Sequence, residues 1–263
     1  MPLARTDLET LLRSRHLDRT LTTALPAPEP DPEYACGPAG VPALDASLGG
    51  GFPRGQLSEI IGARSSGRFS LLVSMMAAAT ARGELVALID ALDMLDVESA
   101  ANAGVALDRL LWIRGHVVTN PGMCRDMNQR ALEQAIRALA LVLQAGNFGL
   151  VAFEAGEAPA GALKRLPFTT WLRLQRMIEG TQTVCVLAGP EPMARSAAGL
   201  TLQLGQAGQA GRAGEEGSQR NWTQTSVRFS DRLFKGLNAE ARVVRARARG
   251  FDDVRVCIST EAC

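Results

Sequence analysis

Lysine is almost absent from this sequence, since only Lys164 and Lys235 occur among the 28 basic residues. The codon bias of a GC-rich genome is a simpler explanation for this than selection for arginine chemistry. No apolar run is long enough to span a bilayer, so we expect no transmembrane helix and no membrane partner. Acidic residues within the first nine positions argue against a signal peptide. Together these features predict a cytoplasmic protein.

Metal-binding patterns are also lacking. The five cysteines are scattered, none forms a C-x-x-C pair, and only two histidines occur. We therefore expect mostly buried, reduced cysteines and no metal site. The formal net charge of +1 favours neither nucleic acid nor any other charged partner, so the distribution of the charges matters more than their sum.

The first forty residues differ in composition from the rest. Residues 1–23 contain a predicted helix at 5–17, with Leu8, Leu11 and Leu12 on one face. Residues 24–40 contain five of the thirteen prolines and read as an extended linker. We interpret residues 1–23 as an arm whose three leucines contact a partner; a helix that packs on its own core is the alternative.

Residues 41–263 form the predicted core, in which short apolar runs alternate with longer amphipathic segments. This alternation predicts an α/β domain with a mostly parallel sheet covered by helices on both faces. The strands are expected at 57–61, 85–90, 110–113, 150–154 and 183–187, and the helices at 67–82, 125–144 and 171–178.

The end of the chain has a different pattern. Residues 205–220 are rich in Gly, Gln, Ala and Glu, which predicts a flexible loop. Polar and apolar residues alternate at 223–229, 241–248 and 253–258, and these segments are expected to form an antiparallel edge on the sheet.

A glycine-rich turn stands where the first of these strands meets a helix. Residues 62–70 read G-A-R-S-S-G-R-F-S, close to the phosphate-loop pattern G-x-x-x-x-G-K-[ST]. Arg68 replaces the lysine, and Phe69 replaces the hydroxyl residue that would hold magnesium, while Ser70 comes one residue later. The candidate ligand-binding residues of this turn are Gly62, Ser65, Ser66, Gly67, Arg68 and Ser70. A tight turn that caps the helix and binds nothing is the alternative.

Several ordered motifs resemble those of RecA-family recombinases. Residues 44–62 read L-D-A-S-L-G-G-G-F-P-R-G-Q-L-S-E-I-I-G, similar to the family's L-D-x-x-L-G-x-G-G-[LI]-P-x-G-x-[IL]-x-E-I-x-G. Residues 88–91 read L-I-D-A where the family has F-I-D-A, and residues 103–111 are similar to its L-G-V-D-x-D-x-L-L. The resemblance implies a RecA-like P-loop NTPase core, with ATP and magnesium as the family's ligands.

The same alignment of motifs shows what this sequence has lost. Leu92 stands where the family has its catalytic glutamate, and Asp93 would point the other way. Glu154 matches the Walker B aspartate, and Gly189 replaces the sensor glutamine. We therefore expect a degenerate ATP site, no catalytic residue and no bound cofactor, with Glu154 among the candidate binding residues.

Basic residues near the C-terminus are candidates for contact with DNA or a partner. Residues 243–247 read V-V-R-A-R, similar to the family's V-V-K-N-K, and alternation places Arg245, Arg247 and Arg249 on one strand face. The full candidate set is Arg212, Arg220, Arg242, Arg245, Arg247 and Arg249. A solvated edge strand whose charges prevent aggregation is the alternative.

Short segments resemble the ImuA-type accessory proteins of bacterial mutagenic repair more closely. These are residues 168–176, F-T-T-W-L-R-L-Q-R, and residues 196–204, S-A-A-G-L-T-L-Q-L. The resemblance implies a pseudo-ATPase scaffold in SOS mutagenesis and translesion synthesis. Its implied partners are an inactive, ImuB-like Y-family polymerase homologue and an error-prone C-family polymerase, with RecA and single-stranded DNA as further candidates. A weak DNA-linked ATPase and a filament-forming recombinase are the alternatives.

Overall fold

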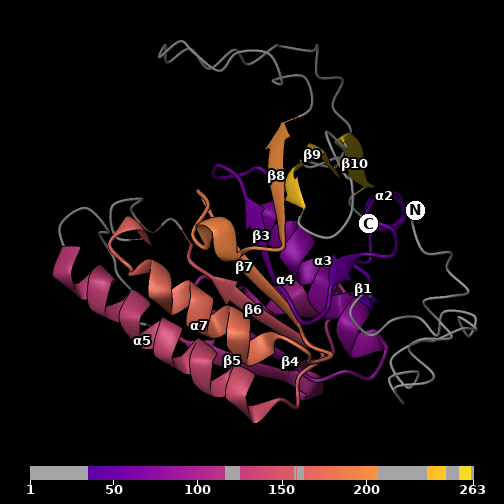
Figure 1. Ribbon diagram of the computed structural model, residues 1–263. Helices are drawn as coiled ribbons and strands as arrows, with labels where there is room; N and C mark the ends of the chain where they lie inside the picture. The colour runs from indigo at the N-terminus through magenta and orange to yellow at the C-terminus, as the bar shows by residue number, and fades with distance from the viewer. Residues whose placement is uncertain are drawn as a thin grey trace, which may run out of the picture. The chain divides into compact units, whose positions relative to one another are not determined.

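The computed structural model describes residues 35–115, 125–156, 158, 163–206, 236–246 and 255–261. An eight-stranded sheet runs through them in the order β10-β9-β8-β3-β7-β6-β4-β5 (Figure 1). The six strands from β8 to β5 are parallel, whereas β9 and β10 pair antiparallel at the other end. The predicted fold class, a mostly parallel α/β sheet with an antiparallel C-terminal edge, is confirmed.

The strands of the large sheet are β3 (Leu57–Ile61), β4 (Val86–Asp90), β5 (Leu110–Arg114), β6 (Leu150–Glu154), β7 (Val184–Gly189), β8 (Leu200–Gln206), β9 (Gly236–Ala246) and β10 (Arg255–Glu261). A small separate sheet pairs β1 (Cys36–Gly37) with β2 (Phe52–Pro53). The helical elements are α2 (Pro42–Ser47), α3 (Arg68–Ala81), α4 (Val97–Asn102), η3 (Leu107–Arg109), α5 (Arg125–Ala145), α7 (Phe168–Ile178) and η4 (Arg195–Ala197). No helix among the described residues is long and apolar enough to cross a membrane.

Two apolar layers hold this sheet between helices. On one face, α3 places Leu72, Met76 and their neighbours against alternate residues of the central strands. On the other face, α5 and α7 contribute Leu132, Leu139 and Trp171 to a second core. Every residue of β3, β4, β6 and β7 is buried, as expected for parallel strands covered on both sides. The continuous apolar runs seen in the sequence follow from this double burial.

The predicted elements of the core are confirmed with small shifts. The helix expected from residue 171 begins at Phe168, with Pro167 as its N-cap residue. The strand expected at 241–248 starts earlier, at Gly236, and ends at Ala246. The strand β8 was not predicted, and its last residues, Gly205 and Gln206, fall in the range expected to be a flexible loop. The predicted helix at 5–17 and the predicted strand at 223–229 lie outside the described residues.

The range 24–40, expected to be a linker, contains structure at its end. There β1 pairs with β2, and Ala39 is fully buried. Of the cysteines in the described ranges, Cys185 is buried as predicted, whereas Cys36 is half-buried and Cys257 is exposed.

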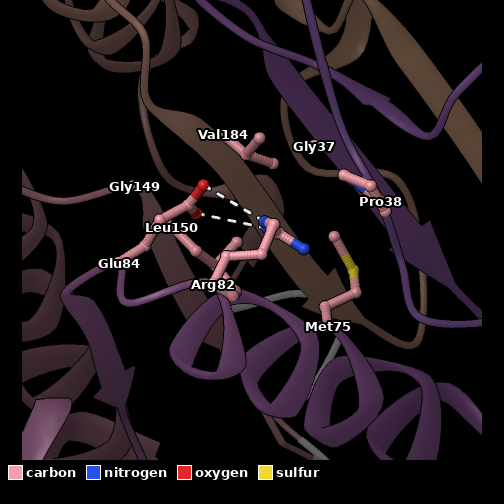
Figure 2. Close-up of a pocket in the computed structure, with 9 residues that line it drawn as sticks. Gly37, Pro38, Met75, Arg82, Glu84, Gly149, Leu150 and Val184 are labelled. Carbon is pink, nitrogen blue, oxygen red and sulfur yellow. Dashed lines mark hydrogen bonds and ion pairs between the residues drawn. The ribbon is translucent and has the colours of Figure 1, made fainter.

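Charged side chains join the loops at the amino ends of the parallel strands. The Arg54 guanidinium donates to the carbonyls of Cys36, Gly149 and Gln182 and forms an ion pair with Glu84 at 2.8 Å. Arg82 pairs with the same carboxylate, and Figure 2 shows these two side chains meeting beside Met75 and Val184. Burial opposes ionisation of Glu84, but hydrogen bonds from Arg82 and Arg54 hold its pKa below the ordinary value. We call Arg54, Arg82 and Glu84 the basal cluster.

Candidate functional site

The phosphate-loop-like turn lies between β3 and α3, at the carboxyl end of the parallel sheet. The Gly62 N–H donates to the Gly189 carbonyl at the end of β7, at 3.2 Å. A Cβ atom at Gly62 would collide with Ser66 Oγ and lie 2.7 Å from the Leu204 carbonyl oxygen. The turn is therefore pressed against β7 and β8, and a glycine at position 62 is required by space.

The turn closes through left-handed backbone at two positions. Ser65 has φ 62° and Gly67 has φ 89°, and the Gly67 carbonyl accepts the first helical hydrogen bond, from Leu71. The conformation at Gly67 explains the second glycine of the motif. The turn and the first residues of α3 line a cavity of about 430 Å³. Its wall includes Ser65, Ser66, Gly67, Arg68 and Ser70, together with Glu154 from β6. The structure thus gathers the predicted binding residues, with Gly62 directly behind them.

Arg68 does not extend into this cavity as a free cation. It is only 6% exposed, and its guanidinium donates to the carbonyl of Gly62 and, at 3.2 Å, to the carbonyl of Gly156. The same group lies 3.4 Å from Glu154 Oε1. The side chain thus links the turn to the segment after β6. Its positive charge interacts with oxygen atoms of the protein itself.

Glu154 is the buried partner of this arginine. Its Oε1 atom also accepts the Gly156 N–H at 2.8 Å, whereas Oε2 has no partner among the described residues. Burial raises the pKa of Glu154 to about 7, against the lowering effect of Arg68 and of the Gly156 hydrogen bond. The buried environment therefore favours the protonated form of this carboxyl group more than water does.

The remaining lining residues are one exposed cation, Arg64, and otherwise small or apolar residues. Leu92, at the position of the family's glutamate, is 8% exposed and lines the cavity with Met94 and Phe69. Asp93 points elsewhere, with φ 56° and a two-pronged ion pair to Arg114 at 2.7 and 2.8 Å. No carboxylate occupies the position of a general base among the described residues of this cavity, apart from Glu154.

Two buried carboxylates next to the site were missed by sequence reasoning. Asp90 Oδ2 accepts the Leu95 N–H at 2.8 Å and the Trp112 indole N–H at 3.3 Å. Glu59 Oε1 accepts the N–H groups of Met193 and Ala194, both at 2.6 Å, and its Oε2 accepts the Thr201 hydroxyl. The available signal was an acidic residue inside an apolar strand, which in a buried strand demands a partner.

The predicted DNA- or partner-binding residues lie away from the cavity. Arg242 and Arg245 are exposed on β9, at the antiparallel end of the sheet. Arg245 donates to the Arg195 carbonyl at 2.8 Å. The other candidates lie outside the described residues: Arg212, Arg220, Arg247, Arg249, Leu8, Leu11 and Leu12.

The sheet order, the strand–turn–helix at its carboxyl end and the carboxylate closing β6 define a RecA-like core with an altered phosphate loop. The family model described as the RecA N-terminal domain matches residues 29–122. The chain is thus RecA-like in sequence as well as in fold.

Three relatives show the extent of this similarity. The protein named "Protein RecA, plasmid" from Lactococcus lactis subsp. lactis is 42% identical over 76 residues, which cover 28% of this chain and 22% of that protein. Protein RecA of a Nocardioides species is 43% identical over 99 residues, 37% of this chain and 25% of the relative. Protein RecA of Clavibacter michiganensis subsp. michiganensis is 33% identical over 164 residues, 57% of this chain and 41% of the relative. The chain therefore spans between about a fifth and two fifths of these relatives.

Proposed function

We propose that this chain is a RecA-like scaffold that works without ATP turnover, as an accessory protein of translesion DNA synthesis. The position of Arg68 carries the proposal. A cation that served a nucleotide would need to face the phosphates, whereas this guanidinium is buried against two carbonyls and a carboxylate. Releasing it would break the hydrogen bonds that Arg68 donates to the carbonyls of Gly62 and Gly156 and to Glu154, all of which are buried contacts, and this is costly.

The residues around the cavity do not fit magnesium-bound triphosphate. Phe69 stands at the position that should supply a hydroxyl ligand, and a phenyl ring cannot bind a metal ion. Glu154 Oε1 already contacts the Arg68 guanidinium at 3.4 Å and accepts the Gly156 N–H, so this oxygen is not directed at a ligand in the cavity. Leu92 cannot activate water. We therefore derive no hydrolytic step for this chain.

Nucleotide binding is tested by thermal denaturation with and without MgATP. We expect the same Tm in both conditions for the natural chain. A ligand present at about a hundred times its Kd would stabilise the fold by about 2.7 kcal/mol and raise Tm by about 5 °C or more. The double variant Arg68→Lys, Phe69→Thr restores the motif's lysine and hydroxyl, and we expect it to gain such a shift. A shift in the natural chain that Arg68→Ala abolishes would overturn the proposal.

The partners follow from the resemblance to ImuA-type proteins. We propose that the chain contacts an inactive Y-family polymerase homologue and, with it, an error-prone C-family polymerase, and that Leu8, Leu11 and Leu12 anchor this contact. Co-expression with these two proteins from the same genome tests the idea: they should co-purify with the natural chain. Replacing the three leucines by serine should abolish the complex, while the matched change Leu141→Ser, at a 68% exposed helix position, should leave it intact.

A weak DNA-linked ATPase is the second candidate. The cavity of about 430 Å³, with Ser65, Ser66 and Ser70 in its wall, favours it. Its signature would be phosphate release that requires DNA and disappears in Glu154→Gln. If neither the natural chain nor this variant releases phosphate above background, the result supports the scaffold function over the ATPase.

A further inference from the structure

The start of α3 presents uncapped hydrogen-bond donors to the cavity. Phe69 and Ser70 line the cavity, and their N–H groups precede the first helical hydrogen bond, which Leu71 donates to the Gly67 carbonyl. Gly67 is the N-cap residue, no side chain caps the helix, and its first turn contains no acidic residue. Donors at a helix N-terminus, together with the positive end of the helix dipole, attract an anion.

Arg64 adds a positive charge to the same cavity. It is exposed, it lines the cavity, and within the part of the chain that the structure describes it has no hydrogen bond or ion pair. The charge of Arg68, the other cation in the wall, is offset by Glu154 at 3.4 Å. The cavity therefore carries one positive charge in excess, which suits a ligand with a single negative charge better than a triphosphate.

Two buried polar atoms in the cavity wall have no partner among the described residues. These are Ser66 Oγ and Glu154 Oε2, and their residues are 4% and 2% exposed. A buried polar atom without a hydrogen bond is costly, and a ligand group that pairs with it removes this cost. The Ser66 hydroxyl can donate to an anion, and the Glu154 oxygen can accept an N–H of a ligand.

Apolar side chains form another part of the wall. Phe69 is half-buried and Leu92 is buried, whereas Met94 is 58% exposed and extends this apolar surface to the rim. Methionine is flexible and packs against apolar groups of different shapes. A ligand that fits the whole wall thus has a negative charge, an N–H donor and an apolar group close together.

We propose that this cavity binds the C-terminal residue of a partner protein. In such a residue the carboxylate, the side chain and the peptide N–H all branch from one Cα atom. The carboxylate pairs with Arg64 and with the N–H groups at the start of α3, and the peptide N–H donates to Glu154 Oε2. The side chain, which is apolar, packs on Leu92 and Met94.

Other anions use less of this wall. Inorganic phosphate has no apolar part, and a fatty acid has no N–H for Glu154. The inference rests on the proposed scaffold function, since a scaffold needs a site for a segment of its partner, and it names the chemistry of that segment. Its residues differ from the three leucines proposed as partner anchors, so the two contacts can be tested separately.

The test uses the full chain and a panel of pentapeptides labelled at the amino end. The panel has every amino-acid type at the last position, and each peptide is prepared as the free acid and as the C-terminal amide. Fluorescence anisotropy measures the affinities. We expect peptides with an apolar last residue to bind as free acids and to lose about tenfold in affinity as amides, because hydrogen bonds to a charged acceptor are lost.

Two variants with matched controls locate the binding site. Arg64→Gln should reduce the preference for the acid over the amide by about fivefold, whereas Arg173→Gln, at an exposed position of α7, should leave it unchanged. Met94→Ser should reduce the preference for an apolar last residue over glycine by about threefold, whereas Leu141→Ser, at an exposed position of α5, should not. Circular dichroism and Tm establish that all four variants fold.

Competition with N-acetyl-leucine and with inorganic phosphate identifies the source of the anion. If either displaces the labelled peptide as well as the same unlabelled peptide does, the cavity belongs to a free small acid or to phosphate, and the inference is overturned. Equal affinities for acids and amides, or no binding by any free acid of the panel, would also overturn it. Co-purification of the polymerase partners without peptide binding rejects this inference alone, whereas ATP hydrolysis by the natural chain rejects the scaffold function.

Discussion

At the scale of single residues, the protonation of Glu154 makes stability depend on pH. The folded state raises its pKa from 4.5 to about 7, chiefly through burial. The folded protein therefore binds this proton more tightly than the unfolded chain does. The stabilisation is complete below pH 4.5 and is lost as pH rises through about 7. A difference of this size is worth about 3 kcal/mol.

We expect Glu154→Gln to remove this component, because an amide does not titrate. Urea denaturation from pH 5 to pH 8 measures the free energy of unfolding at each pH. The natural chain should lose stability across this range relative to the variant. Glu133→Gln, at an exposed position of α5, serves as the control and should follow the natural chain. Parallel pH profiles for the natural chain and Glu154→Gln would show that Glu154 titrates normally.

The direction of Arg68 illustrates what residue types alone can and cannot predict. The glycine spacing predicts the turn, because the left-handed backbone conformation at Gly67 favours glycine, and a glycine is visible in the sequence. The inward path of Arg68 depends on the carbonyls of Gly62 and Gly156, which lie on two different segments. No local sequence pattern predicts that these two carbonyls lie close to Arg68. The positive charge at position 68 could therefore be predicted, but the direction of its side chain could not.

At the scale of elements, Glu59 fixes the connection between β7 and β8. Its carboxylate, 1% exposed in β3, accepts the N–H groups of Met193 and Ala194 and the hydroxyl of Thr201. Glu59→Ala leaves two buried N–H groups without an acceptor, and we expect a loss of about 3 kcal/mol in the free energy of unfolding. Glu59→Gln keeps an acceptor oxygen and should lose only about 1 kcal/mol.

Native-state hydrogen exchange distinguishes this local role from general damage. The amides of Met193 and Ala194 should exchange faster in Glu59→Ala by more than the change in global stability requires. In Glu59→Gln their protection should stay close to that of the natural chain. Uniform changes across all strands would mean that Glu59 contributes only to the core as a whole.

The elements that sequence reasoning missed share a physical reason. β8 alternates apolar and polar residues over a short stretch. Because glycine-rich sequence follows it directly, the whole region resembles a loop and the strand is hard to recognise. In the pairing of β8 with β9, Thr201 is opposite Arg245 and Leu202 is opposite Val243, so Val244 forms a β-bulge. This bulge has no sequence signature of its own, since Val is a common strand residue. Alternation therefore placed Arg245 correctly on β9 but gave no information on its neighbours Arg242 and Arg255. That juxtaposition depends on register with two other strands.

At the scale of the whole molecule, the parallel sheet could be predicted but its strand order could not. Buried apolar strands separated by helices are sufficient to predict parallel pairing. The order places β3 between β7 and β8, strands more than a hundred residues away in sequence. Local composition does not encode contacts between residues so far apart in the sequence, so the order of the strands came from the structure alone.

The basal cluster ties these distant segments together at the opposite edge from the cavity. Arg54, next to β2, reaches the carbonyls of Cys36, Gly149 and Gln182, and so joins the first described residues to the segments that lead into β6 and β7. We expect Arg54→Ala to lower the free energy of unfolding by about 2 to 3 kcal/mol, because charge-assisted hydrogen bonds to several elements are lost together. Arg82→Ala should cost less, about 1 kcal/mol or below, since Arg82 contacts only Glu84 among these groups and is more exposed.

The pH dependence of this cluster has the opposite sign to that of Glu154. Hydrogen bonds from Arg82 and Arg54 outweigh burial and lower the pKa of Glu84, so the unfolded chain binds this proton more tightly than the folded protein. Its contribution is present above the ordinary pKa of 4.5 and is lost as pH falls through the folded value. Urea denaturation between pH 3 and pH 5 should therefore show a smaller acid-induced loss in Glu84→Gln than in the natural chain. An unchanged acid profile in Glu84→Gln, together with full stability of Arg54→Ala, would mean that the apolar layers alone hold the amino ends of the strands.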